Sequence, residues 1–186
     1  MRIIAGMHRG RRLIAPKGKQ TRPTTDRSRE ALFSALSHQL DQDFSERQVL
    51  DLFAGSGALG LEALSRGAAH ATFVERAPAA VDSINANIDA LGLAENTKIL
   101  KADATRPPRT IGPFNLVFID PPYDLKRAAS SILACIDAQI VAEDVLFCLD
   151  SSIFEADLLP DLPLSILWSK RVSQSHLTIC SLENLS

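Results

Sequence analysis

The sequence has few cysteines and no spacing typical of a metal site. Its three cysteines, Cys135, Cys148 and Cys180, are far apart, and no Cys-x-x-Cys pair occurs. An odd number of scattered cysteines supports neither a disulfide framework nor a zinc site. The four histidines are equally scattered. We therefore interpret the cysteines as small core residues and expect no bound metal.

Long hydrophobic runs are also missing. No apolar stretch approaches the roughly 20 residues that span a bilayer, and the start of the chain, Met1–Gly6, lacks the apolar core of a secretory signal. A hydrophobic fraction of 46% over 186 residues is ordinary for one globular domain with a sizeable core. We expect a cytoplasmic, monomeric protein of one domain (1–186) that does not contact membranes.

The charge is unevenly distributed. Residues 1–30 hold nine Lys and Arg against two acids, a net charge of +7, so the remaining residues must carry −9 to give the total of −2. A basic segment on an acidic body is typical of a nucleic-acid contact, although a solvated tail has the same composition. Apolar residues around Gly6 and Gly10 favour a short hairpin. We predict a basic hairpin and loop (1–24) on an α/β body (25–186).

Seven basic residues are candidates for contact with nucleic acid: Arg9, Arg11, Arg12, Lys17, Arg22, Arg27 and Arg29. Arg27 and Arg29 fall in the first turn of an expected helix, where the helix dipole disfavours cations. They either face an anion or point into water.

The body alternates strand and helix patterns, which predicts a mostly parallel sheet with helices on both faces. The last two strands have no room for a helix between them and predict an antiparallel hairpin. We expect strands at 48–53, 71–75, 97–101, 114–119, 145–149, 164–168 and 177–182.

A glycine-rich turn, Gly55-Ser56-Gly57-Ala58-Leu59-Gly60, follows the first strand, and Glu75 lies 20 residues after Gly55. This pattern is typical of nucleotide binding but is weak by itself, because such a turn also packs a helix on a strand. Asp51 would repel a pyrophosphate and suits a cation. Three acids at successive strand ends, Asp51, Glu75 and Asp103, therefore favour S-adenosylmethionine over a nicotinamide dinucleotide.

The fourth strand ends in Asp120-Pro121-Pro122-Tyr123. Neither proline can extend a sheet ladder, and each holds its predecessor in an extended conformation. The result is a stiff elbow at the carboxyl end of a strand, where open α/β sheets bind ligands. A carboxylate, carbonyls and an aromatic ring there suit a planar amino donor, although a plain strand end with Tyr123 in the core is the simpler alternative.

Together, Leu52–Gly57, Glu75 and the elbow resemble class I S-adenosylmethionine-dependent methyltransferases. The stretches Arg2–Leu13, Thr21–Phe33 and Asp51–Ala68 are similar to the RsmD-like family, which methylates the N2 amino group of a guanine in 16S ribosomal RNA. The resemblance runs to about residue 124. Beyond it, Ser173-Gln174-Ser175-His176 stands where the family usually carries a glycine.

The resemblance implies a Rossmann-like class I fold with a seven-stranded sheet, S-adenosylmethionine as cofactor, and ribosomal RNA within a small-subunit particle as substrate. Its implied catalytic residues are Asp120, Pro121, Pro122 and Tyr123. Its implied cofactor-binding residues are Asp51, Phe53, Ala54, Gly55, Ser56, Gly57, Glu75, Asp103 and Ala104. Alternatives are methylation of adenine N6 or of a protein glutamine, which present the same planar amino group, or an inactive RNA-binding relative.

Overall fold

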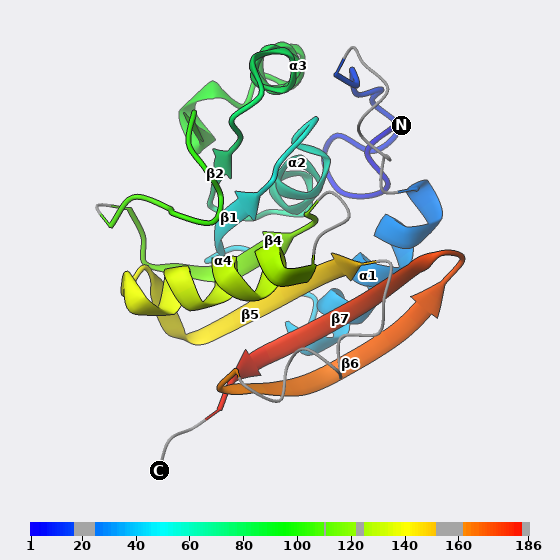
Figure 1. Ribbon diagram of the computed structural model, residues 1–186. Coiled ribbons are helices and arrows are strands. Elements are labelled where there is room, and N and C mark those ends of the chain that lie inside the picture. Colours follow the sequence, from blue (N-terminus) through cyan, green and yellow to red (C-terminus); the bar gives the residue numbers. More distant parts are fainter. Residues whose placement is uncertain (17–24, 110, 122–124, 152–161, 184–186) are drawn as a thin grey trace.

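The computed structural model shows one twisted sheet with helices on both faces (Figure 1). It describes residues 1–16, 25–109, 111–121, 125–151 and 162–183. The strands are β1 Gln48–Leu52, β2 His70–Val74, β3 Thr97–Leu100, β4 Phe114–Ile119, β5 Val141–Ser151, β6 Leu164–Val172 and β7 Ser175–Leu182. The helices are α1 Asp26–Gln39, α2 Ala58–Ser65, α3 Pro78–Leu91 and α4 Leu125–Asp137, with a 3-10 turn η1 at Ala94–Asn96.

The sheet has the strand order β3-β2-β1-β4-β5-β7-β6. Strands β1 to β5 are parallel, whereas β7 pairs antiparallel with both β5 and β6. The predicted mostly parallel sheet with a C-terminal antiparallel hairpin is therefore confirmed. The order changes direction at β1 and β4, and ligands in open α/β sheets bind beside such a switch point.

Two apolar clusters lie on opposite faces of the sheet. Helices α1, α2 and α3 pack on one face, against Val49, Phe73 and Phe118. Helix α4 covers the other face, against Leu50 and Val117. Alternate residues of one strand thus enter different cores, as the period of a strand requires, and the continuous apolar run 116–119 of β4 reflects a strand that is buried on both faces.

The helix ends follow local sequence signals. The Thr25 side chain accepts a hydrogen bond from the Ser28 backbone N–H (3.1 Å) and caps α1. Pro78 occupies the first turn of α3, and Gly92 ends that helix in a left-handed conformation (φ 68°). Local sequence signals thus mark where α1 begins and where α3 begins and ends.

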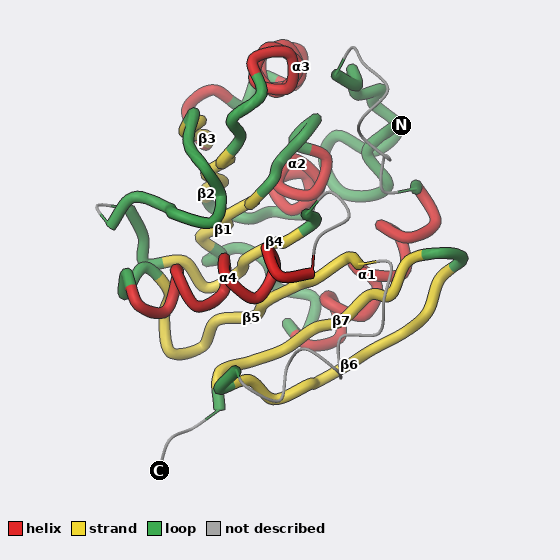
Figure 2. Tube along the Cα trace, in the orientation of Figure 1, coloured by secondary structure: helices red, strands yellow, loops and turns green. Residues whose placement is uncertain are grey.

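The N-terminal arm (residues 1–16) is more closely packed than a surface hairpin. Its regular pairing is the single bridge between Arg2 and Arg12, and most of it is drawn as a loop beside α2 in Figure 2. Ile3 and Leu13 are buried in the same core as α1 and α2. The arm is therefore a packed part of the body, which the basic composition alone did not reveal.

In the part of the chain that the structure describes, no helix is long and apolar enough to cross a bilayer. Cys135, Cys148 and Cys180 are buried in the core, and burial raises the pKa of the Cys135 thiol to about 12. This agrees with a packing role for the three residues.

Candidate active site

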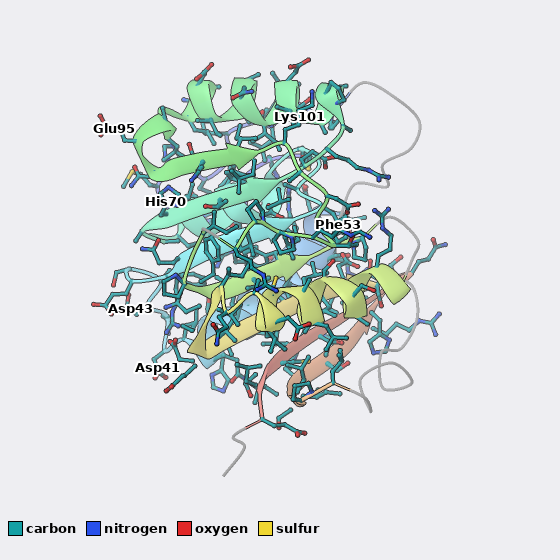
Figure 3. The ribbon with its side chains drawn as sticks, turned by 60° about the vertical axis from the view of Figure 1, so that its left-hand side comes forward. Asp41, Asp43, Phe53, His70, Glu95 and Lys101 are labelled. Atoms are coloured by element: carbon teal, nitrogen blue, oxygen red, sulfur yellow. The ribbon has the colours of Figure 1, made fainter. Side chains whose placement is uncertain are left out.

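The predicted site residues gather at one edge of the sheet because the parallel strands end in register. Leu52 pairs with both Val74 and Ile119, and Val74 pairs with Leu100. The residues that follow these strand ends therefore emerge side by side. Figure 3 shows Phe53 and Lys101 at this edge and His70 at the opposite one.

The glycine-rich turn is fixed by two carboxylates. The Gly60 N–H donates to Asp51 Oδ2 (2.9 Å), and the Gly55 N–H donates to Glu75 Oε2 (3.0 Å). A side chain at Gly60 would meet Phe73 Cε1 at 2.5 Å, and Gly57 has a left-handed conformation at the start of α2 (φ 77°). Both glycines are thus required by the close approach and backbone shape of the turn.

Glu75 accepts more backbone hydrogen bonds than its predicted role requires. Besides Gly55, its Oε1 accepts the N–H groups of Arg76 and Ala77 (both 2.8 Å). The carboxylate is half-buried at the end of β2. It therefore shapes the turn and still has an exposed portion at the edge where a ribose would bind.

Asp51 is the most perturbed acid of the site. Its side chain is 2% exposed, and burial raises its pKa well above the ordinary value. The negative charges of Asp120 and Glu75 add to this, while the hydrogen bond from Gly60 opposes it. Three carboxylates held this close repel one another, so the site favours a cation. Their negative charge fits the ammonium and sulfonium groups of S-adenosylmethionine.

Asp103 lies with two residues that form a small cluster at the same edge. Its Oδ1 accepts from the backbone N–H (3.0 Å) and hydroxyl (2.9 Å) of Thr105, and these bonds, with a smaller effect of Arg127, lower its pKa. The Arg127 guanidinium lies 3.6 Å from Asp103 Oδ1 and 5.4 Å from the centroid of the Phe53 ring. Phe53 itself has a left-handed backbone (φ 59°), which is unusual for a bulky residue. Arg127 was not predicted, because nothing in the local sequence marks a lone arginine near the start of α4.

The remaining predicted cofactor residues are buried within or beneath the turn. Ala54 and Ser56 are each 8% exposed, and Ala104 is 4% exposed and packs in the α4-side core. Their side chains pack against protein, so contact with a cofactor would fall mainly to their backbone.

The structure describes half of the elbow. Asp120 is half-buried immediately after β4, and Pro121 is buried. The charge of Asp120 acts on Asp51, which places the two carboxylates in one electrostatic cluster. Pro122 and Tyr123 lie outside the described residues.

The basic candidates divide into exposed and buried side chains. Arg9, Arg12 and Arg27 are exposed, and Arg11 is exposed but donates to the Ala90 carbonyl at the end of α3 (2.7 Å). Lys17 and Arg22 lie outside the described residues.

Arg29 corrects the prediction of a nucleic-acid contact at that position. Its side chain has no exposed area, and it donates to the Arg2 carbonyl (2.6 Å) and to Asp26 (2.7 Å). A guanidinium enclosed in this way cannot reach a phosphate, so the prediction was wrong. Arg29 instead holds the arm against α1, and burial lowers its pKa.

The strand order, the glycine-rich turn after β1 and the acids near the strand ends occur together in this structure. This combination is that of a class I methyltransferase. Comparison with known proteins is consistent with this class. The solved structure of yhhF from Escherichia coli is 34% identical, covers 98% of both chains and has a TM-score of 0.81. That of the 16S rRNA N2 G1207 methyltransferase RsmC from Thermus thermophilus, with AdoMet and guanosine, has a TM-score of 0.69. At 23% identity, over 88% of this chain and 45% of that one, the second likeness concerns the fold alone.

The chain belongs to the family described as Conserved hypothetical protein 95, whose model matches residues 1–180. Ribosomal RNA small subunit methyltransferase D of Haemophilus influenzae is 37% identical over 136 residues, which is 71% of this chain and 68% of that protein. The Escherichia coli protein of the same name is 45% identical over 124 residues, 66% of this chain and 60% of that protein.

Proposed function

We propose that the protein transfers a methyl group from S-adenosylmethionine to the exocyclic N2 of a guanine in small-subunit ribosomal RNA. The observation that carries the proposal is the grouping of Asp51, Glu75 and Asp120 at the carboxyl edge of β1, β2 and β4. There Asp51 and Glu75 hold the glycine-rich turn (2.9 and 3.0 Å), and burial, with a smaller effect of the charges of Asp120 and Glu75, raises the pKa of Asp51. The names of the relatives from Escherichia coli and Haemophilus influenzae support ribosomal RNA as the substrate.

S-adenosylmethionine, when bound, supplies a methyl group on a sulfonium centre. Asp51 and Glu75 would hold it, since they offer negative charge to its cationic groups and an acceptor to its ribose. Phe53 and Asp103 lie along the same edge, where Asp103 offers an acceptor to an adenine amino group. Each of the four lies near the carboxyl end of a parallel strand, so a rigid sheet sets their spacing.

Asp120 and Pro121 would position the nitrogen that is methylated. The lone pair of a guanine amino group is delocalised into the ring, which makes it a poor nucleophile. The Asp120 carboxylate and the Pro121 carbonyl would accept hydrogen bonds from the two N–H groups of this amine. These bonds would favour a geometry in which the nitrogen lone pair points at the methyl carbon. The methyl group that S-adenosylmethionine would supply would pass to this nitrogen, which would then lose a proton to Asp120 or to water. Most of the rate gain would come from positioning and electrostatics.

The N-terminal arm would hold the RNA. Its exposed Arg9 and Arg12, with Arg27 at the start of α1, supply positive charge on a body that otherwise carries an excess of acids. Phosphate contacts of this kind provide affinity without sequence specificity, so the choice of guanine would depend on the elbow. A guanine in structured RNA must be unstacked to enter it.

Transfer of a labelled methyl group separates this proposal from its alternatives. The purified protein is incubated with labelled S-adenosylmethionine and with free 16S RNA, small-subunit particles or ribosomal proteins. The proposal expects label in the RNA of at least one of the first two substrates, recovered as N2-methylguanosine, whereas recovery as N6-methyladenosine would favour the adenine alternative. Label in protein alone would favour a glutamine methyltransferase, and absence of label with intact RNA binding would favour an inactive relative.

A further inference from the structure

Asn87 joins the N-terminal arm to the glycine-rich turn. It lies on α3 and is 1% exposed. Its Oδ1 accepts from the Ile14 N–H (2.7 Å), and its Nδ2 donates to the Ile14 carbonyl (3.0 Å) and to the Ser56 carbonyl (2.9 Å). One side chain therefore connects a residue 73 positions away in the arm with a residue 31 positions away in the turn.

The amide of Asn87 is satisfied only when both partners are in place. A side-chain amide offers two donors and an acceptor with two lone pairs, and a buried one that loses its partners is costly. If the arm moves away, one donor and the acceptor lose Ile14. If the turn shifts, the other donor loses Ser56. Each contact thus favours the arrangement in which the other is also made.

Further contacts also join the N-terminal arm to the glycine-rich turn and to α2. The Ser56 hydroxyl lies 3.6 Å from the Met1 sulfur, to which it donates. On α2, directly after the turn, Glu62 accepts from the backbone N–H groups of Ile4 and Ala5 (2.7 and 3.0 Å). The arm consequently rests on the two helices that follow the candidate cofactor residues.

We propose that Asn87 is a positioning residue that couples RNA binding by the arm to cofactor binding at the turn, so that each ligand raises the affinity for the other. The inference rests on the proposed function. Asn87 is the shared partner of both segments: RNA that binds Arg9 and Arg12 acts on the arm that holds Ile14, and a cofactor at the turn acts on Ser56. A ligand that holds one segment in place also preserves the contact of Asn87 with the other. Linkage requires the two effects to be equal.

The test is a thermodynamic cycle. The affinity for S-adenosylhomocysteine is measured by calorimetry with and without saturating 16S RNA, and the RNA affinity is measured with and without S-adenosylhomocysteine. For the wild type we expect both ratios to be equal and about fivefold or more. Asn87→Ala brings both ratios close to one. The matched control is Asn85→Ala, an exposed asparagine on the same helix, which keeps the wild-type ratios.

A merely structural role for Asn87 predicts a different result. In that case Asn87→Ala would lower both affinities but leave unchanged the ratio of each affinity with and without the other ligand. This result would overturn the proposal, and so would a ratio of one in the wild type. If Asn87→Ala does not fold, amide hydrogen exchange of Ile14 in the wild type provides the test. The proposal expects this exchange to slow when S-adenosylhomocysteine binds in the absence of RNA. An unchanged exchange rate refutes the coupling. If the wild type methylates 16S RNA but shows no coupling, only this inference fails. If it methylates 16S RNA neither free nor within small-subunit particles, the proposed function fails as well.

Discussion

Replacing Gly6 by alanine tests how the arm is docked, and Gly10 provides the matched control. Both glycines have a φ of 82°, so alanine carries the same left-handed strain at each, about 1–2 kcal/mol. A side chain at Gly10 would meet no atom within 4 Å, whereas one at Gly6 would overlap the Ser65 carbonyl at the end of α2. Since that carbonyl belongs to a packed helix, the arm must move.

Three hydrogen bonds around Ser65 would then be lost. The Met7 N–H donates to its carbonyl (2.7 Å), the His8 N–H donates to its hydroxyl (3.0 Å), and that hydroxyl donates to the Ala5 carbonyl (2.6 Å). At about 1 kcal/mol net for each bond, Gly6→Ala should cost about 4–5 kcal/mol in total, against about 1–2 kcal/mol for Gly10→Ala.

Equilibrium unfolding in urea measures both values. Trp168, the one tryptophan of the chain, packs against the core that also holds α1 and the arm, and its fluorescence reports unfolding. Hydrogen exchange at Met7 and His8 would show whether the loss is local to the arm. Equal destabilisation by the two substitutions would refute the docking argument, because only Gly6 lies against α2.

Three further predictions concern the ligands. Because the pKa of Asp51 is raised in the folded protein, its contribution to stability is greatest at low pH and declines as pH rises through that raised value, while affinity for a cationic cofactor increases over the same range. The substitution Asp51→Asn should remove both trends. If calorimetry across pH finds both trends unchanged in this variant, Asp51 is not their source. Glu75→Ala should weaken cofactor binding by about 1.5–3 kcal/mol, roughly tenfold to a hundredfold, and an unaltered Kd would remove Glu75 from the site. Replacing Arg9 and Arg12 together by alanine should flatten the log–log salt dependence of RNA affinity by about 1.4 to 1.8 units if each contacts one phosphate; an identical slope would place the RNA surface elsewhere.

The sheet could be predicted because its signals are local. Apolar runs alternate with helical periodicity, and Pro78 and Gly92 mark where α3 begins and ends. The least accurate strand boundaries were the start of β5, at Val141 rather than 145, and the end of β6, at Val172 rather than 168. Glu143 and Asp144, near the start of β5, are exposed. A register shift in the pairing with β4, between Phe114 and Leu116, accommodates these additional residues of β5. A charged strand end of this kind has no apolar pattern to reveal it.

The final hairpin was predicted in spite of its unusual turn. Ser173 has a φ of 59°, where glycine is the easier residue. The pairing of β6 and β7 along 164–172 and 175–182 is nevertheless continuous except for one shift between Ile166 and Trp168. Pairing and burial of β7 therefore outweigh one unfavourable turn residue.

The site was predictable where residues follow strand ends and not where contacts are made over long sequence distances. Glu75 and Asp120 were recognisable because they end or follow apolar strands, and Asp51 because it shortly precedes the glycine-rich turn. Arg29 was misinterpreted because composition shows its charge but not the arm that encloses it. Asn87 was overlooked because it lies on the apolar stripe of α3, and its partners at Ser56 and Ile14 are distant in the sequence.

Identifying the methylated nucleoside tests the central claim most directly. Ribosomal RNA labelled by the wild type is digested to nucleosides and analysed by mass spectrometry, beside RNA treated with Asp120→Ala. The account predicts N2-methylguanosine from the wild type and its loss from Asp120→Ala, which should still bind S-adenosylmethionine. Methyl groups on adenine N6, or undiminished N2-methylguanosine from Asp120→Ala, would contradict it.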